Sequence, residues 1–182
     1  MLITVALVLL LASVPLLGGR LGRLAEVRFR AAWLAALALA LQVLVIEVVP
    51  GGDGWAHRAV HVASYGLLFA FVAANVRHVP WLWLIALGGA GNAIAIAVNG
   101  GVMPARPGAL EAAGVEQAAG EFVNSGAVDG ARLAWLGDVF AVPASWPVAG
   151  VFSVGDVLLL VGVALCLHAI CGRRAPVALA PA

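Results

Sequence analysis

The sequence predicts an all-α, polytopic membrane protein with five transmembrane helices and a long extracytoplasmic loop between the fourth and the fifth. Hydrophobic residues make up 64% of the 182 residues and charged residues only 10%, whereas soluble domains carry about 45–50% and about 25%. Five apolar stretches are each long enough to cross a bilayer core, which needs roughly 20 residues of helix. All ten basic residues are arginines, and most fall on one side of the five stretches.

The five helices are expected near residues 2–18, 31–49, 59–76, 81–99 and 153–171. A bilayer offers no partners to backbone N–H and C=O groups, so a spanning segment of this kind must be helical. The first stretch differs from a secretory signal, because no basic residues precede it and no small-residue cleavage site follows it. We therefore expect residues 1–182 to form a single membrane domain.

The arginines also predict the orientation, because basic residues favour cytoplasmic loops. Seven of them lie on connections that share one side: Arg20, Arg23, Arg28, Arg30, Arg77, Arg173 and Arg174. The opposite side receives only Arg58, Arg106 and Arg132, together with most of the acidic residues. The sequence thus predicts a multi-pass protein of the cell (plasma) membrane with its N-terminus outside and its C-terminus in the cytoplasm.

The extracytoplasmic loop, residues 100–152, is divided by prolines and glycines into shorter segments. Residues 109–122 are rich in alanine and glutamate and are predicted to be helical. Residues 133–140 are apolar apart from Asp138. Trp135 in this segment and the nearby Trp146 indicate that it lies at the membrane interface. The predicted partners are the lipid bilayer and a protein that binds this loop. A formal net charge of +1 excludes nucleic-acid binding through a basic surface, and no cofactor is expected.

Asn92 is a polar residue near the middle of the fourth predicted helix, where an uncompensated polar group is costly. It follows Gly88, Gly89 and Gly91, and small residues allow a neighbouring helix to approach closely. The amide then serves either as an interhelical hydrogen-bonding group or as a catalytic or ligand-binding group. The following Asn99-Gly100-Gly101 favours a left-handed exit from the helix.

Asp53, His57 and His61 are weak candidates for a metal site at the outer end of the third predicted helix. The two histidines are four residues apart and share one helix face, as metal-binding pairs do. Arg58 stands between them and would repel a cation. With one carboxylate the set is incomplete, and we expect no metal.

Asp138 and Asp156 are the strongest candidates for chemistry. Ser153 and Asp156 have the spacing of a capping box at the start of the fifth predicted helix, which explains Asp156 without any reaction. Asp138 is an isolated acid in an apolar segment. The connection between the two acids contains Pro143, Pro147 and Gly150, so it can fold back and bring them together. Two adjacent carboxylates ionise unequally, as an aspartyl hydrolase requires.

Several motifs cover most of the chain: Gly91-Asn92, Asn99-Gly100-Gly101-Val102-Met103-Pro104, Asn124-Ser125, Leu136-Gly137-Asp138, Pro143 and Phe152-Ser153-Val154-Gly155-Asp156. Together they resemble an uncharacterised bacterial membrane family, the domain of unknown function 5317. This resemblance implies no activity.

The same region is also similar, in part, to lipoprotein signal peptidase, a membrane aspartyl enzyme. The similarity rests on Gly91-Asn92, on Asp138 and on Phe152-Ser153-Val154-Gly155-Asp156 after Trp146-Pro147. It implies a catalytic role for Asp138 and Asp156, with Asn92 orienting a carboxylate or the substrate. The enzyme has an Asp-Arg pair where this chain has Ala95 and Ile96, an asparagine in place of Ser153, and an outer β-cradle that the short loop at residues 51–54 cannot supply.

Three classes of function follow. The sequence favours a non-enzymatic accessory or scaffold protein in which Asp156 is a cap and Asn92 packs helices. The first alternative is a membrane aspartyl hydrolase or peptidase that uses Asp138, Asp156 and Asn92. The second alternative binds a small ligand or metal ion at the outer face through Asp53, His57 and His61.

Overall fold

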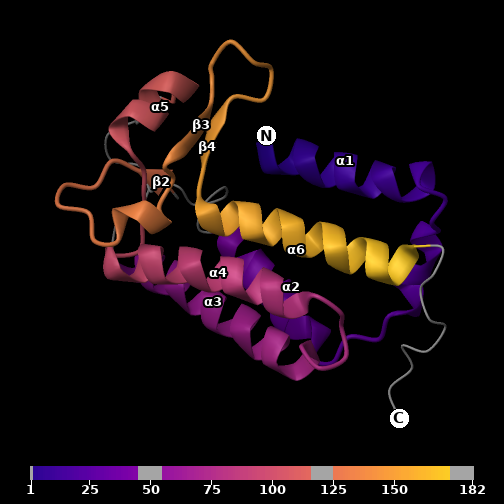
Figure 1. Ribbon diagram of the computed structural model, residues 1–182. Coiled ribbons are helices and arrows are strands. Elements are labelled where there is room, and N and C mark those ends of the chain that lie inside the picture. Colours follow the sequence, from indigo (N-terminus) through magenta and orange to yellow (C-terminus); the bar gives the residue numbers. More distant parts are fainter. Residues whose placement is uncertain (1, 45–54, 116–124, 173–182) are drawn as a thin grey trace.

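Five helices form most of the structure, a computed structural model that describes residues 2–44, 55–115 and 125–172 (Figure 1). They are α1 (Leu2–Leu16), α2 (Ala32–Val43), α3 (Trp55–Asn75), α4 (Leu82–Val98) and α6 (Val154–Cys171). Each coincides largely with one of the five apolar stretches, so the prediction of a mostly helical chain is confirmed. Helix α3 begins at Trp55, four residues before the predicted start, and residues 45–49 of the second predicted helix lie outside the described residues.

The lengths of the helices differ from the prediction of five full spans. Among the described residues only α6, with 18 residues, is both long and apolar enough to cross a bilayer by itself. The apolar helices α1, α2 and α4 have 15, 12 and 17 residues. Helix α3 has 21 residues but carries His57, Arg58 and His61 in its first two turns. Among these residues one helix thus meets the requirements of a full span, and five full spans are not shown.

Short elements fill the long connection between α4 and α6. Its helices are α5 (Pro107–Ala113) and the 3-10 turn η3 (Ala134–Leu136), and its strands are β1 (Met103–Pro104), β2 (Ser125–Gly126), β3 (Phe140–Val142) and β4 (Gly150–Phe152). Strands β1 and β2 pair in parallel, whereas β3 and β4 form an antiparallel pair. A further 3-10 turn, η1 (Leu21–Glu26), follows α1. These strands were not predicted from the sequence.

The predicted helix at residues 109–122 is shorter than expected. Helix α5 begins at Pro107 and stops at Ala113, because Gly114 adopts a left-handed conformation with φ of 64°, which ends a helix readily. The remainder of the predicted segment, residues 116–122, lies outside the described residues.

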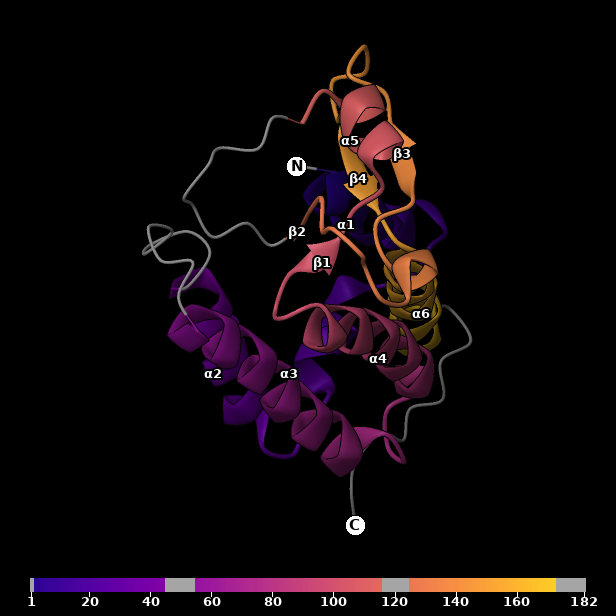
Figure 2. The same ribbon diagram turned by 90° about the vertical axis from the view of Figure 1, so that its left-hand side faces the viewer.

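Helices α4 and α6 make the most extensive contact in the structure, and glycines form it. A Cβ atom on Gly88 would lie 2.5 Å from the carbonyl oxygen of Gly155, and one on Gly162 would lie 2.7 Å from Cγ1 of Ile85. Helix α3 packs on the other side of α4 and α2 packs on α3, so the four helices lie in the order α2, α3, α4 and α6 (Figure 2).

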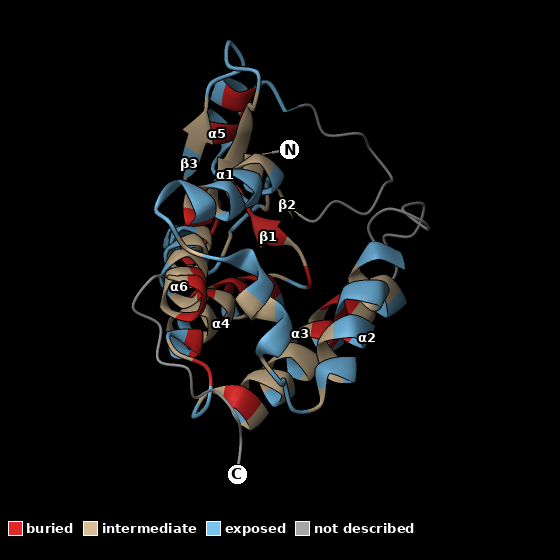
Figure 3. Ribbon diagram, turned by 90° about the vertical axis from the view of Figure 1, so that its right-hand side faces the viewer, coloured by how far each residue is buried: buried red, intermediate tan, exposed pale blue. Residues whose placement is uncertain are grey.

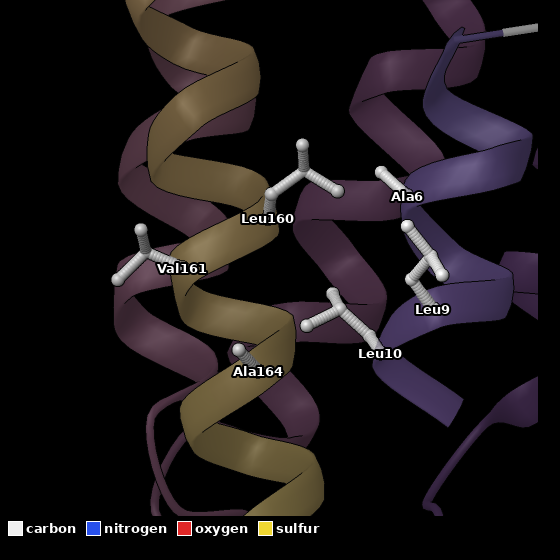
Figure 4. Close-up of a pocket in the computed structure, with 6 residues that line it drawn as sticks. All are labelled: Ala6, Leu9, Leu10, Leu160, Val161 and Ala164. Atoms are coloured by element: carbon white, nitrogen blue, oxygen red, sulfur yellow. The ribbon is translucent and has the colours of Figure 1, made fainter. Parts of the chain in front are cut away.

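Helix α1 joins α6 through its C-terminal end. Val14 is buried in a cluster with Leu167 and Ile170, and the Arg20 amide donates to the Cys171 carbonyl at 2.9 Å. Further along the two helices an apolar groove of about 390 Å³ separates them (Figure 4). Its lining comes from both helices: Ala6, Leu9, Leu10, Leu160, Val161 and Ala164.

The glycine contact between α4 and α6 predicts how alanine substitutions change the stability of the folded protein. Gly155→Ala would place a Cβ atom 2.0 Å from Oδ1 of Asn92, and overpacking of this kind costs about 1–3 kcal/mol. Gly89→Ala is the matched control, since nothing lies within 4 Å of its Cβ position. Thermal unfolding in detergent should show a lower midpoint for Gly155→Ala only. Equal midpoints for the two variants would contradict the close helix crossing.

Candidate functional site

The first turn of α6 carries a complete capping box, as predicted. The Ser153 hydroxyl accepts a hydrogen bond from the Asp156 amide at 3.0 Å, and Asp156 Oδ2 accepts from the Ser153 amide at 2.9 Å. Ser153 is fully buried. Since these bonds satisfy backbone groups that a helix start leaves unpaired, they fix the position of the Asp156 carboxylate.

Asn92 connects this cap to α4. Its Nδ2 donates to Asp156 Oδ1 at 2.8 Å, and its Oδ1 accepts from the Ser153 hydroxyl at 2.9 Å. The same hydroxyl lies 2.9 Å from Asp156 Oδ2, and because a hydroxyl has one proton, the two oxygens share it in turn. The predicted interhelical hydrogen bond of Asn92 is confirmed, and its acceptor is the carboxylate of Asp156.

Asp138 is held by the backbone of the segment that follows α4. Its amide donates to the Pro104 carbonyl at 2.9 Å, and its carbonyl accepts from the Arg106 amide at 3.0 Å. The preceding Gly137 permits this contact, since a Cβ atom there would lie 2.0 Å from the Pro104 carbonyl oxygen. The Asp138 side chain is only 6% exposed, and its Oδ2 accepts a short hydrogen bond from the Ser125 hydroxyl.

The two acids interact, although they come from different parts of the chain. Burial raises the pKa of Asp138 from 3.8 to about 6, the hydrogen bond from Ser125 opposes this rise, and the charge of Asp156 adds to it. The structure therefore brings Asp138 and Asp156 within electrostatic reach of each other. Asp156 has three hydrogen-bond donors around it, whereas the carboxylate of Asp138 is buried with the Ser125 hydroxyl as its donor.

Ser125 contacts Asp138 although no local pattern in the sequence predicts this contact. It lies in β2, where it is paired with Met103 of β1, and it contacts an acid thirteen residues further along the chain. The segment between them has no helical or strand periodicity that would place the two side chains together. The only signal in the sequence was the position of Ser125 in one of the family motifs.

The exit of α4 has the predicted left-handed geometry, with φ of 71° at Gly100 and 94° at Gly101. Asn99 has a second function there. Its side chain donates to the Arg132 carbonyl and accepts from the Arg132 amide, both at 2.8 Å. These bonds attach the segment that precedes Asp138 to the end of α4.

The histidines of α3 do not assemble a metal site within the described residues. His61 is buried, and its Nδ1 hydrogen bonds to the Gly101 carbonyl at 3.1 Å, so this ring nitrogen is already used. Residues 2–44, 55–115 and 125–172 contain no group of three or more histidine, cysteine or acidic side chains that could hold a metal ion. Asp53 lies outside these ranges, and ligand binding by Asp53, His57 and His61 stays a prediction.

These observations define a mostly helical protein in which Asn92 of α4 is hydrogen-bonded to Ser153 and Asp156 at the start of α6. Residues 26–168 match a family of unknown function (DUF5317), and the chain belongs to that family, as its motifs indicated. An uncharacterized protein of Thermotoga maritima is 29% identical over 163 residues, which make up 90% of this chain and 88% of the relative. No solved structure matches the chain.

The raised pKa of Asp138 predicts that the stability of the folded protein depends on pH. The pKa is raised by folding, so the folded state binds more protons than the unfolded state between pH 3.8 and about 6, and stability falls as the pH rises through this window. Asp138→Asn removes this loss of stability, because asparagine does not ionise. At pH 8 the variant should be more stable than the native protein by on the order of 1–3 kcal/mol, and this difference should shrink markedly at pH 5.

Unfolding midpoints measured from pH 4.5 to 8.5 test this expectation. Asp129→Asn is the matched control, because Asp129 lies in the same connection and is exposed. A difference for Asp138→Asn that is the same at every pH would show that Asp138 does not titrate in this range.

Proposed function

We propose that the protein is a multi-pass protein of a bacterial inner membrane, with α1, α2, α3, α4 and α6 as its membrane helices. Large apolar side chains on the outer faces of these helices support this proposal; Leu9, Leu39 and Leu87, for example, are 65%, 61% and 53% exposed. Figure 3 shows exposed residues along α2 and α3, with buried residues confined to inner faces. A bilayer would remove such surfaces from water.

The positions of the tryptophans also support a membrane location. Trp33, Trp81 and Trp83 lie at the starts of α2 and α4, whereas Trp55 starts α3 and Trp135 lies in η3, at the opposite end of the helices. Each of these side chains is at least 40% exposed. Tryptophans gather at the two interfaces of membrane proteins. The arginines near α1 and α2 then assign the cytoplasmic side.

Cysteine labelling tests this orientation. In a Cys166→Ser/Cys171→Ser background, Ser145→Cys should react with a membrane-impermeant maleimide on intact spheroplasts, because Ser145 is exposed in the outer connection. Ala25→Cys, exposed in η1, should react only after the membrane is permeabilised. The reverse pattern, or equal labelling of both sites before permeabilisation, would refute the proposed topology.

We further propose that the protein is a membrane aspartyl hydrolase. One observation carries this function: the chain places two interacting acids in unequal environments, Asp138 buried with a pKa of about 6 and Asp156 hydrogen-bonded by Asn92 and Ser153. Such an unequal pair supplies a general acid and a general base. The partial resemblance to lipoprotein signal peptidase, which matches the same two acids and Asn92, supports the same function.

The reaction we propose is hydrolysis of a peptide bond. Asp156 accepts a proton from water while the water oxygen attacks the carbonyl carbon, and Asp138 donates its proton to the carbonyl oxygen. The carbon–nitrogen bond then breaks, the proton held by Asp156 passes to the leaving amine, and the hydroxyl proton of the intermediate returns to Asp138. Asn92 keeps the Asp156 carboxylate oriented throughout.

The depth of the site suggests where the substrate lies. Asn92 precedes the end of α4 at Val98 by six residues, which corresponds to about 9 Å along the helix axis. Asp156, which Asn92 contacts, therefore lies below the outer end of α4, whereas Asp138 lies against Ala105, just beyond that end. In a membrane orientation, the bond to be cut would enter the outer interface of the bilayer.

Heavy-oxygen water provides a direct test of the hydrolase proposal, since hydrolysis places the water oxygen in the new carboxyl group. Inner-membrane vesicles with the native protein should yield labelled C-termini by mass spectrometry. Asp138→Asn and Asp156→Asn should each lower the yield at least about 100-fold, and the native rate should fall as the pH rises through about 6. Asp129→Asn is the control. Equal labelling in all four chains would exclude this function.

A scaffold or accessory function is the second candidate, and the capping box favours it. The hydrogen bonds of Ser153, Asn92 and Asp156 stabilise the α4–α6 crossing whether or not a reaction takes place. Asp156→Asn would then leave function nearly intact, with the helix-dipole contribution of about 0.3–1 kcal/mol lost. The partner would bind the outer connection, residues 100–152.

A further inference from the structure

We propose that Ser125 is a positioning residue for the acid pair: its hydroxyl, held in place by the backbone of β2, fixes the orientation of the Asp138 carboxyl through Oδ2. The inference rests on the proposed hydrolase function, which requires Asp138 to deliver a proton. It concerns how this carboxyl is held and not the presence of a reaction.

The backbone around β1 holds both residues of this pair. Ser125 is registered against Met103 on one side of the segment, and Asp138 is bridged to Ala105, two residues further along it. The Ala105 amide also donates to the carbonyl of Gly126, next to Ser125, at 2.7 Å. Residues 103–105 thus hold both Ser125 and Asp138 through backbone contacts. The backbone therefore places the hydroxyl of Ser125 next to the carboxyl group of Asp138.

The contact with Ser125 fixes which oxygen of Asp138 faces β2. Oδ2 of Asp138 is the oxygen bonded to the Ser125 hydroxyl, and a hydroxyl can donate to a carboxylate or accept from a neutral carboxyl. The carboxyl can therefore keep the same orientation in both protonation states, with Oδ2 toward Ser125.

The hydrogen bond also has an electrostatic effect that a purely structural contact would not have. A donor to a carboxylate stabilises its charged form, and Ser125 acts on Asp138 in this direction. In the described part of the chain, Asp156 from α6 and Tyr65 from α3 are the other titratable groups that interact with the charge of Asp138. Neither changes when Ser125 is replaced, so a shift in the titration of Asp138 reports on the hydroxyl.

The experiment is a pH titration of the aspartate carboxyl carbons by ¹³C NMR in nanodiscs. The chain has four aspartates, and the spectrum of Asp138→Asn assigns the signal of Asp138. Ser125→Ala should raise its titration midpoint by about one to two pH units. Ser125→Thr and Ser125→Val introduce side chains of the same shape, of which only threonine has a hydroxyl. The threonine variant should therefore keep the native titration midpoint of Asp138, and the valine variant should raise it. Ser145→Ala, exposed in the same connection, is the control.

An unchanged midpoint in both Ser125→Ala and Ser125→Val would overturn the proposal. In the heavy-oxygen assay, the same two variants should lower the rate and move its alkaline limit upward, with rescue by Ser125→Thr. If the native protein labels no peptides while the midpoint still shifts, the hydrolase function fails and the contact between Ser125 and Asp138 stands. If the native protein labels peptides but the titration midpoint of Asp138 does not shift in the Ser125 variants, the hydrolase function stands and the positioning role of Ser125 is rejected.

Discussion

The close approach of α4 and α6 is the constraint on which the rest of the structure depends. It is possible only because Gly88 faces Gly155, where a side chain on either residue would collide with the opposite backbone. At this separation the amide of Asn92 reaches the carboxylate of Asp156. The start of α6, the position of the acid and the packing of two helices are therefore determined together, and a change in any one of them alters the other two.

The two acids differ because different parts of the chain hold them. Asp156 belongs to a helix start, which supplies amide and hydroxyl donors at short range. Asp138 belongs to an irregular segment, where Gly137 lets the backbone lie against Pro104 and where the Ser125 hydroxyl faces the carboxylate. A helix cap and a buried loop acid are each common in proteins. Here the two lie near enough to each other for the charge of Asp156 to raise the pKa of Asp138.

The sequence predicted the features that depend on local patterns. The apolar stretches located all five helices, the spacing of Ser153 and Asp156 predicted the capping box, and Asn99-Gly100-Gly101 predicted the helix exit. The strands and the role of Ser125 were beyond prediction, since pairs of two or three residues leave no periodic signal and depend on contacts between distant segments. The length of α5 was overestimated, because its alanine-rich continuation hid the helix-ending effect of Gly114.

The attachment of Arg132 to Asn99 has a consequence for conformational entropy. The segment from Ser125 to Asp138 is tied at its ends by their side chains and near its middle by the two bonds to Asn99. One loop thereby becomes two shorter ones, each with fewer accessible arrangements. The conformational entropy of the segment that carries Asp138 is thus lost largely during folding and not during binding. The carboxyl group then meets any incoming molecule already ordered, and binding does not have to supply the free energy for arranging it.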